Sequence, residues 1–454
     1  MSGKLFGTDG IRGRANKYPM VPEFALKLGQ AAGVMLTSKK KRVAICRDTR
    51  VSGEMLEAAL VAGFTSVGVD VLLLGVLPTP AMIMLSVSYD IDMAVIITAS
   101  HNPYYDNGIK IVDGEGKRFS DSVMSDLEKK ALEGKVELES DKLGRVEHLK
   151  GEDAKYLSLV KKVFDNSGNL KGLRVVLDCA NGVLSEVLPE IFKQLGAGVI
   201  TLGNNPDGYN INKESGSQHP KEMMDTVVKS NANLGIAVDG DGDRILVCDE
   251  KGKRVDPDQL LAFFAKEMIR REQLKGNAVV STIVSNLGLE KFVTSLGLDY
   301  YATDVGERFI LEKMEEIGSN IGGEESGHIV LSDYAKSGDG LVAALFMSQA
   351  LLKSGKKMSE IFPVFDVVVK KRVDVEFDGF DKISKAMSSE VLKKAMEDCE
   401  KELADKGKIL VRKSGTEPKI QTWVWCDDDK LRQKASDMLV GAVSEEALKA
   451  EEKP

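Results

Sequence analysis

The chain has 454 residues, of which 43% are hydrophobic and 29% are charged, and its formal net charge is −8. A chain of this length and composition should fold into several globular domains rather than stay disordered. The negative net charge argues against nucleic acid as the main partner. The longest apolar stretch, residues 69–77, is too short to span a membrane, and the N-terminal residues lack the apolar run of a signal peptide. We therefore expect a cytoplasmic protein with neither a membrane nor a nucleic acid as partner.

The cysteines are scattered singly and show no Cys-x-x-Cys spacing of the kind that marks a zinc site or a redox pair. Four of them lie in strand-like runs, which suits a small apolar side chain packed between a sheet and helices. We therefore expect reduced thiols in the cores of the domains at Cys46, Cys179, Cys248, Cys399 and Cys426.

A candidate nucleophile lies in the first part of the chain. Ser100 comes shortly after the apolar, strand-like run 93–97, and the His-Asn-Pro turn that follows would leave its hydroxyl at the end of the strand, facing a cleft. A returning strand at 108–112 would bring Lys110 near that hydroxyl, beside His101. A serine needs such neighbours to act as a nucleophile. The alternative is an ordinary turn between two strands.

The second part of the chain contains a candidate metal site. Asp239, Asp241 and Asp243 alternate with glycines between the strand-like runs 236–238 and 245–247. Three carboxylates at alternate positions can converge on one hard cation, because glycine lacks the Cβ atom that would resist a tight turn. Such a cation usually needs a further oxygen ligand, and a phosphate on Ser100 would supply one.

An EF-hand is the competing interpretation of this acidic loop. The three aspartates and Glu250 match the ligand positions of the calcium loop, but Arg244 stands where that loop needs glycine. The flanking runs are also typical of strands, whereas an EF-hand requires helices. A hairpin with three aspartates at its tip is therefore the better prediction.

The chain repeats one pattern three times: a buried strand, a helical stretch, and a hairpin with polar residues at its tip. The third copy begins at 278–281 and has its hairpin tip at 321–328. Beyond Pro363, the run 366–369, a helical stretch at 382–406 and strands at 409–411 and 420–423 indicate a smaller α+β domain. We expect three similar α/β domains with mixed sheets and a C-terminal α+β domain. Junctions at 142–155, at 249–253 and near Pro363 predict the domains 1–150, 151–252, 253–365 and 366–454.

The last two strands of this tail enclose a candidate phosphate-binding loop. Residues 412–418 combine an arginine, two hydroxyl side chains and a glycine. Backbone amides around a glycine and an arginine fork can cradle a phosphate, although a Ser-Gly-Thr turn on its own is common.

Five motifs in this order resemble those of the α-D-phosphohexomutase family, and most closely the phosphoglucosamine mutases. Any one of them could arise by chance, whereas five in sequence hardly could, and the resemblance covers essentially the whole chain. They resemble the family's N-terminal, phosphoserine, metal, sugar and phosphate loops at residues 6–13, 98–103, 239–244, 323–328 and 412–418, respectively.

The resemblance implies four domains around a central cleft and a phosphate carried by Ser100 in the active enzyme. It implies one Mg²⁺ held by Ser100, Asp239, Asp241 and Asp243, with glucosamine or glucose 1,6-bisphosphate as activator. The implied reaction converts glucosamine 6-phosphate into glucosamine 1-phosphate through a 1,6-bisphosphate intermediate, and so feeds UDP-N-acetylglucosamine synthesis. Relatives suggest a homodimer.

The resemblance also assigns roles to individual residues. Arg12 and Arg244 would neutralise charge on the transferring phosphoryl group, and His101 or Lys110 would assist proton transfer. His328 would be either a general base or a packed strand histidine. Substrate would be held by residues of the sugar and phosphate loops: Glu324, Ser326, Arg412, Ser414, Gly415 and Thr416.

The chain departs from the family pattern at two positions. Gln421 stands where many relatives place an arginine, with Lys419 two residues before it, and Asp304 stands where relatives often carry lysine. A cation has therefore moved or been lost near the phosphate loop. His148 and His219 match no motif, and we expect surface or structural roles for them.

Three alternative functions stay open at this point. A phosphomannomutase or phosphoglucomutase of the same family would use similar pockets. A metal-dependent phosphatase usually needs a histidine-rich site with two metals, and the chain has four histidines in all. A non-catalytic sugar-phosphate sensor would have no reason to keep Ser100 and all three aspartates.

Overall fold

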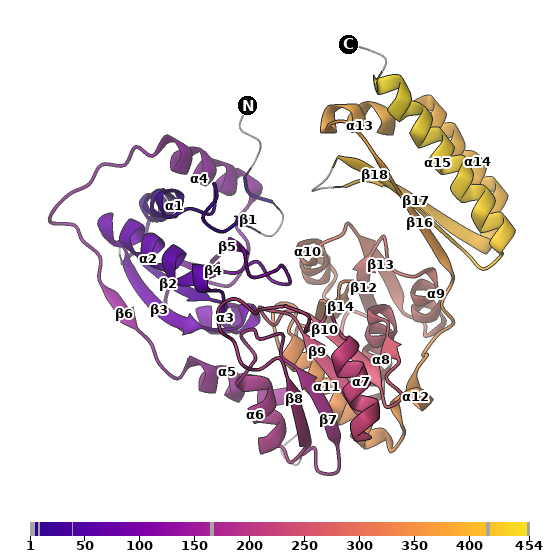
Figure 1. Cartoon of the computed structure of the whole chain (residues 1–454), viewed down its shortest axis with the longest axis horizontal. Helices are drawn as coiled ribbons and strands as arrows, with labels where there is room; N and C mark the ends of the chain where they lie inside the picture. The colour runs from indigo at the N-terminus through magenta and orange to yellow at the C-terminus, as the bar shows by residue number, and fades with distance from the viewer. Residues whose placement is uncertain (1–4, 8–9, 39, 164–167, 415–417, 452–454) are drawn as a thin grey trace. The chain divides into compact units, whose positions relative to one another are not determined.

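The structure is a computed structural model of the chain, and it describes residues 5–7, 10–38, 40–163, 168–414 and 418–451 (Figure 1). The chain forms two compact units: residues 1–276 with 306–363, and residues 277–305 with 364–454. Within the described ranges, no helix combines the length and the apolar character that crossing a membrane requires.

The first unit begins with a mixed sheet of six strands in the order β1-β5-β4-β2-β3-β6. β2 runs parallel to β3 and β4, and β5 runs antiparallel to β4 and β1. β4 is apolar along its whole length and fully buried, as expected for a central strand. The strands are β1 (Ile11–Arg14), β2 (Arg42–Arg47), β3 (Asp70–Val76), β4 (Met93–Ile97), β5 (Asp106–Asp113) and β6 (Val146–His148).

Helices that pack on this sheet form the first core. Apolar side chains of α1 and α2, including Phe24, Leu28, Leu60 and Phe64, join those of α4 and buried residues of the strands in one contiguous cluster. Burial of this apolar surface is the main force that holds the layers together. The helices are α1 (Pro22–Met35), α2 (Val51–Ser66), α3 (Thr79–Ser86) and α4 (Asp121–Glu133).

A second mixed sheet follows, with five strands in the order β11-β10-β9-β7-β8. β7 is parallel to β8 and β9, whereas β9 and β10 form an antiparallel hairpin whose strands are completely buried. Its strands are β7 (Arg174–Asp178), β8 (Gly198–Leu202), β9 (Leu234–Val238), β10 (Ile245–Asp249) and β11 (Arg254–Val255). Its helical segments are α5 (Glu152–Val160), η1 (Lys161–Val163), α6 (Val187–Gln194) and α7 (Lys221–Ser230).

The rest of the first unit comprises four helices and a short hairpin. α11 is buried over most of its length, and Asp339 caps its start by accepting the amides of Leu341 at 2.9 Å and Val342 at 3.0 Å. The buried Tyr156 hydroxyl donates to the same carboxylate at 2.9 Å. The elements are α8 (Pro257–Arg270), α10 (Glu307–Ile317), β14 (Ile321–Gly323), β15 (Ile329–Leu331), α11 (Gly340–Ser354) and α12 (Met358–Ile361).

The second unit holds a parallel strand pair, β12 with β13, and an antiparallel sheet in the order β16-β18-β17. Helices cover this sheet and bury the apolar residues of the tail. The fold class predicted from the sequence, α/β with mixed sheets and a smaller α+β tail, is confirmed. The elements are β12 (Ala278–Thr282), α9 (Leu287–Ser295), β13 (Asp299–Thr303), β16 (Lys370–Glu376), α13 (Phe380–Met387), α14 (Glu390–Leu403), η2 (Ala404–Lys406), β17 (Gly407–Lys413), β18 (Lys419–Cys426) and α15 (Asp429–Glu451).

Two of the expected junctions contain regular structure. Residues 142–155 include β6, which pairs with β3, and the start of α5. Residues 249–253 form the turn between β10 and β11, in which the Asp249 carboxylate accepts the amides of Lys251 and Lys253. A charged composition therefore marked an edge strand and an Asx turn, because both are solvated on one side.

The tail differs from its sequence prediction in two elements. Its first strand begins at Lys370, after the expected run 366–369, and the single expected helix at 382–406 is two helices. Ser389 separates the helices, because its hydroxyl accepts the Leu392 amide at 3.1 Å as an N-cap. All five cysteines are free and buried, as expected.

Candidate active site

Ser100 lies in the turn that joins β4 to β5. Its backbone has a φ of 52°, in the left-handed region that a residue with a side chain rarely adopts. The hydroxyl donates to Asp239 Oδ2 at 2.7 Å and lies 3.3 Å from His101 Nδ1. The sequence predicted a hydroxyl facing a cleft, but Ser100 is only 1% exposed, because the aspartate loop packs against it.

The aspartate loop is the tip of the β9–β10 hairpin, with strands on both sides, which excludes the EF-hand. Asp239, Asp241 and Asp243 are buried, and one ligand oxygen from each lies within 4.8 Å of the others. Glycine is required at two positions of this loop. Gly242 has a φ of 78°, and a Cβ atom on Gly240 would lie 2.7 Å from the Ser100 carbonyl oxygen.

Burial and mutual repulsion shift the pKa values of these carboxyls. Burial raises the pKa of Asp239, and the charges of Asp243 and Asp241 add to this rise. Burial, with the charge of Asp241, raises the pKa of Asp243 to about 8. For Asp241, burial is outweighed by Lys110 and by a hydrogen bond from Thr79, so its pKa falls below the ordinary value. A further cation beside Lys110 would therefore favour the ionised forms of Asp239 and Asp243.

The cluster has the oxygen ligands that a hard divalent cation needs. Asp241 Oδ1 and Asp243 Oδ1 are buried, and neither makes a hydrogen bond to any part of the chain that the structure describes. Buried acceptors are normally paired, and carboxylate oxygens are the ligands that Mg²⁺ and Ca²⁺ prefer. These residues therefore fit such a cation, with Ser100 adjacent to them.

Lys110 is the cation already present in the cluster. It extends from β5, and its Nζ lies 3.1 Å from Asp241 Oδ2 and 3.5 Å from Asp243 Oδ2. The sequence predicted Lys110 near the serine hydroxyl, and the structure places it against the aspartates that surround that hydroxyl. Lys110 can therefore neutralise anionic charge at this site.

Arg12 and Arg244 approach from two other elements. Arg12 lies on β1 opposite Gly108 of β5, in the strand that returns from the serine turn. The Arg244 amide donates to Asp239 Oδ1 at 3.1 Å, which fixes the residue beside the triad. Burial, together with the charges of Arg244 and Arg12, lowers the pKa of His101 to about 3. His101 is therefore neutral at physiological pH.

The sugar-loop residues form a compact hydrogen-bonded group around the β14–β15 hairpin. Glu324 Oε1 accepts from the Ser326 hydroxyl at 2.8 Å, and Oε2 accepts from the Gly306 amide at 3.1 Å. Arg244 Nε donates to His328 Nε2 at 2.9 Å, so that lone pair of the imidazole is already used. His328 could accept a proton on Nε2 only if Arg244 moved away.

The tail loop belongs to the second unit and is described by itself. Arg412 is on β17, and its Nε donates to the Lys413 carbonyl oxygen at 3.4 Å. Ser414 is buried, and its amide donates to the Lys419 carbonyl oxygen at 2.9 Å. Lys419 Nζ also lies 3.1 Å from Asp374 Oδ2, beside the position of Gln421 on β18.

Several predicted residues lie outside the described part of the chain. These include Gly415 and Thr416 of the tail loop and Thr8 and Asp9 of the N-terminal loop. His148 and His219 are exposed, as expected. Arg308, four residues after Asp304, pairs with Asp121 at 3.0 Å.

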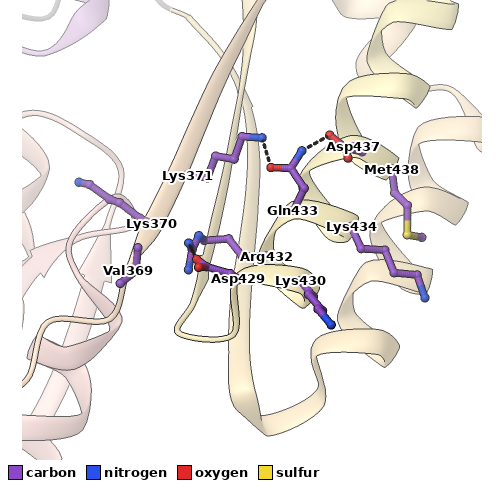
Figure 2. Close-up of a pocket in the computed structure, with 10 residues that line it drawn as sticks. All are labelled: Val369, Lys370, Lys371, Asp429, Lys430, Arg432, Gln433, Lys434, Asp437 and Met438. Atoms are coloured by element: carbon purple, nitrogen blue, oxygen red, sulfur yellow. Dashed lines mark hydrogen bonds and ion pairs between the residues drawn. The ribbon is translucent and has the colours of Figure 1, made fainter.

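The second unit also contains a hollow of about 1000 Å³ that includes none of the predicted site residues. Figure 2 shows that it lies between β16 and α15, where the Lys371 ammonium donates to Gln433 and the Gln433 amide donates to Asp437. Its cations are therefore partly engaged by neighbouring side chains. The lining residues are Val369, Lys370, Lys371, Asp429, Lys430, Arg432, Gln433, Lys434, Asp437 and Met438.

Sequence reasoning missed polar residues that follow other strands of the first sheet. The Thr79 hydroxyl, at the start of α3, donates to Asp241 Oδ2 at 2.8 Å. Asp48 and Arg50, directly after β2, contact the segment around Ser100. Carboxyl ends of parallel strands meet at one edge of a sheet, so the position of these residues after a strand was the signal that could have found them.

Family models match nearly the whole chain in four consecutive segments. Models described as Phosphoglucomutase/phosphomannomutase, alpha/beta/alpha domains I, II and III match residues 3–137, 154–252 and 256–366, respectively. The model of the C-terminal domain matches residues 371–442.

Relatives of similar length are named phosphoglucosamine mutase. The protein of Phenylobacterium zucineum strain HLK1 is 45% identical, with 97% of this chain and 98% of the relative covered. The protein of Paramagnetospirillum magneticum strain AMB-1 is also 45% identical, with 98% and 99% covered.

Solved structures share the fold at lower identity. A phosphoglucomutase/phosphomannomutase family protein of Burkholderia thailandensis has a TM-score of 0.83 at 24% identity, with 98% of both chains covered. N-acetylphosphoglucosamine mutase of Aspergillus fumigatus, solved with GlcNAc-6P and magnesium, has a TM-score of 0.68 at 16% identity, with 98% of this chain and 96% of that chain covered.

Proposed function

The chain belongs to the phosphoglucomutase/phosphomannomutase family, and from this premise we propose that it interconverts glucosamine 6-phosphate and glucosamine 1-phosphate as a phosphoglucosamine mutase. One observation carries the chemistry: a buried serine hydroxyl hydrogen-bonded to a triad of buried aspartates. The 45% identity to proteins named phosphoglucosamine mutase, over nearly the whole chain, supports the choice of substrate.

The proposed reaction consists of two phosphoryl transfers. The phosphoryl group leaves Ser100 Oγ for O1 of glucosamine 6-phosphate, which loses its proton and becomes the 1,6-bisphosphate. The 6-phosphoryl group then moves to Ser100 Oγ, O6 takes up a proton, and glucosamine 1-phosphate is released. The serine thus serves as leaving group in one step and as acceptor in the other, and the phosphoenzyme is regenerated.

The buried residues around Ser100 would stabilise these transfers. A Mg²⁺ bound by Asp239, Asp241 and Asp243, with the oxygen on Ser100, would neutralise negative charge on the phosphoryl group when present. Lys110, Arg12 and Arg244 would supply positive charge that is already in place before the substrate binds. Neutral His101, close to the serine oxygen, would accept or return a proton, with Lys110 as the alternative.

Substrate would be held at both of its ends. Glu324 and Ser326 would bind ring hydroxyls, because their oxygens keep lone pairs beyond the bonds they make to each other and to Gly306. The phosphate that is not being transferred would bind the tail loop, at Arg412, Ser414, Gly415 and Thr416.

The proposal extends to four further properties. The activator would be glucosamine or glucose 1,6-bisphosphate, because either restores a phosphate lost from Ser100. The enzyme would work in the cytoplasm as a homodimer and would feed UDP-N-acetylglucosamine synthesis. The family matches support four domains, for which we propose the limits 1–150, 151–252, 253–365 and 366–454.

Ranking of substrates tests this proposal. We expect kcat/KM to be highest for glucosamine 6-phosphate when it is compared with glucose 6-phosphate and mannose 6-phosphate, with Mg²⁺ and bisphosphate present. A higher value for either other sugar would assign the chain to a phosphoglucomutase or phosphomannomutase activity. Absence of turnover on all three would favour a sugar-phosphate sensor.

A further inference from the structure

Arg50 is a completely buried arginine that directly precedes α2. Its Nε donates to Asp48 Oδ2 at 2.8 Å, and its backbone amide donates to Asp48 Oδ1 at 2.9 Å. Burial raises the pKa of Asp48, and the charge of Arg50 opposes that rise. A buried ion pair seldom adds net stability, so its remaining hydrogen bonds indicate what it is for.

Those hydrogen bonds all go to the turn that carries Ser100. Arg50 Nη2 donates to the carbonyl oxygens of Ser100 at 2.9 Å and Asn102 at 2.8 Å. Nη1 donates to the carbonyl oxygens of Asp106, at 3.0 Å, and Pro103. The planar fork of one guanidinium therefore fixes the orientation of four peptide groups, which a lysine could not do.

Asn212, in the segment between β8 and α7, holds the same turn. Its Nδ2 donates to the carbonyl oxygens of Ser100 at 2.8 Å and Asn102 at 3.0 Å. Two carbonyls thus accept from both Arg50 and Asn212. Because Arg50 follows β2 of the first sheet and Asn212 follows β8 of the second, the two donors hold this turn from connections of both sheets.

Asp48 also fixes the amide side of the serine. The Thr98 hydroxyl donates to Asp48 Oδ2 at 2.7 Å, and the Ser100 amide donates to Thr98 Oγ1 at 2.9 Å. Both peptide groups of Ser100 are therefore held, one through Thr98 and the other by Arg50 and Asn212. A left-handed conformation at a residue with a side chain persists only when its surroundings impose it.

We propose that Arg50, Asp48 and Asn212 are positioning residues that form a clamp on the Ser100 turn and keep the serine oxygen at the aspartate triad during both phosphoryl transfers. The inference rests on the proposed function of Ser100. One oxygen must be aligned as leaving group and later as acceptor, so a displaced turn impairs both steps. Substrate contacts are untouched, so the clamp should act on kcat rather than on KM.

Two clamp variants and two control variants test the clamp. Each is measured for kcat and KM with glucosamine 6-phosphate and Mg²⁺, and for melting temperature. Arg50→Lys keeps the charge and loses the fork, and we expect kcat to fall by about 100-fold with KM changed by less than about twofold. Asn212→Ala removes one of two donors, and we expect a loss of roughly tenfold in kcat.

Matched controls separate positioning from general stability. Arg271→Lys alters another largely buried arginine, whose Nη1 donates to Gln349 at 2.8 Å. Asn320→Ala removes an equally buried amide that donates to the Gln273 carbonyl oxygen and to Asp333, both at 2.8 Å. We expect both controls to lower the melting temperature and to leave kcat within about twofold of the wild-type value.

The double variant Arg50→Lys/Asn212→Ala gives a second readout. Because both side chains hold the same carbonyls, the combined loss of kcat should be smaller than the product of the single losses. A combined loss equal to the product of the two single losses would mean that the two residues act independently, and it would contradict the proposed clamp.

Three further results would overturn the proposal. The first is wild-type kcat in folded Asn212→Ala, which decides the matter if Arg50→Lys fails to fold. The second is an equal loss of kcat in the controls, and the third is a rise in KM instead of a fall in kcat. Ser100→Ala separates the proposed function from the clamp. Turnover by that variant would refute the proposed nucleophile. An inactive Ser100→Ala beside a fully active Arg50→Lys would refute the clamp alone.

Discussion

The Ser100 site and the described residues of the tail loop differ in how their side chains are held in place. Around Ser100, groups from both mixed sheets bind one another: the serine donates to Asp239, and Lys110 and Thr79 bind Asp241. In the tail, Arg412 is partly exposed and its Nε donates to the carbonyl oxygen of the next residue. One region is assembled by long-range contacts, and the other presents its arginine from the end of a strand.

This difference matches the demands that the proposed reaction makes on each region. Electrostatic stabilisation of a transferring phosphoryl group is most effective when charges are placed before the substrate arrives. A site that must hold either phosphate of the substrate needs positive charge but tolerates a less rigid arrangement. We therefore expect changes near Ser100 to lower kcat and changes in the tail loop to raise KM.

Ser100→Ala should have the largest effect. We expect kcat to fall by more than about 1000-fold with an unchanged melting temperature, because the oxygen that carries the phosphoryl group is gone while little packing is lost. Intact-mass measurement should show a fraction of wild-type protein one phosphate heavier and no such fraction in the variant. Ser348→Ala, a buried serine of α11, is the control. Unchanged turnover in Ser100→Ala would contradict the assignment.

Asp241→Asn should change the metal dependence. The amide oxygen can still ligate a cation, but one charge is lost, so we expect the Mg²⁺ concentration for half-maximal activity to rise by about tenfold or more. Titration of activity with Mg²⁺ measures this, and excess metal should restore part of kcat. An unchanged Mg²⁺ dependence would make the aspartate loop a structural feature.

Arg412→Ala tests the other half of the comparison. Loss of a fork donor to phosphate should cost roughly 2 to 3 kcal/mol of binding, which appears as a higher KM in both reaction directions. Phosphorylation of Ser100, followed by intact mass, should persist. If kcat falls and KM does not change, the distinction between the two regions fails. If neither changes, phosphate is bound elsewhere, and Lys419 is the next residue to replace.

Asp339 gives a pH-dependent effect on stability in the first unit. Burial raises the pKa of Asp339 to about 6 against the opposing effects of its hydrogen bonds. The folded chain therefore keeps a proton that the unfolded chain releases near pH 4, so wild-type stability falls as pH rises through this window. Asp339→Asn cannot ionise. Its free energy of unfolding relative to wild type should therefore become more favourable from about pH 4 to about pH 7, by up to roughly 3 kcal/mol.

Asp374 in the tail should show the opposite pH dependence with the smallest effect. Hydrogen bonds from Arg372 and Lys419 lower the pKa of Asp374 to about 2, against the effect of burial. Its ionised form stabilises the fold above the unfolded pKa, and this contribution is lost as pH falls toward about 2. Asp374→Asn should cost less than about 1 kcal/mol at neutral pH, because the pair is partly exposed. Thermal melts at several pH values compare both variants directly.

The serine turn and the aspartate loop could be located from the sequence because each is contiguous. Ser100 and the aspartates follow apolar strands within a few residues, so strand pattern and motif together located them. Thr79 was missed because its partner Asp241 is 162 residues away in the chain. Arg50 was missed for the same reason, since it acts on a turn about 50 residues later. Local patterns contain no information on such contacts.

The start of the tail shows a different limit of sequence reasoning. Residues 366–369 are rich in valine, a composition that favours a strand. The Val368 amide instead donates to Asn286 Oδ1 at 3.1 Å, and Asn286 Nδ2 donates to the Val368 carbonyl oxygen at 3.0 Å. A side-chain amide thus replaces a neighbouring strand as hydrogen-bond partner.

The buried cysteines supply a built-in reporter of local opening. Cys46 lies in the first sheet, Cys248 in the second and Cys399 in the tail, so each region contains a thiol of its own. Burial raises the pKa of Cys248 to about 12 and that of Cys399 to about 11, and it also raises the pKa of Cys46. A thiol reagent therefore reacts with each one only after its region has opened. The order in which the cysteines are labelled would give the order in which the regions lose their structure, without any introduced probe.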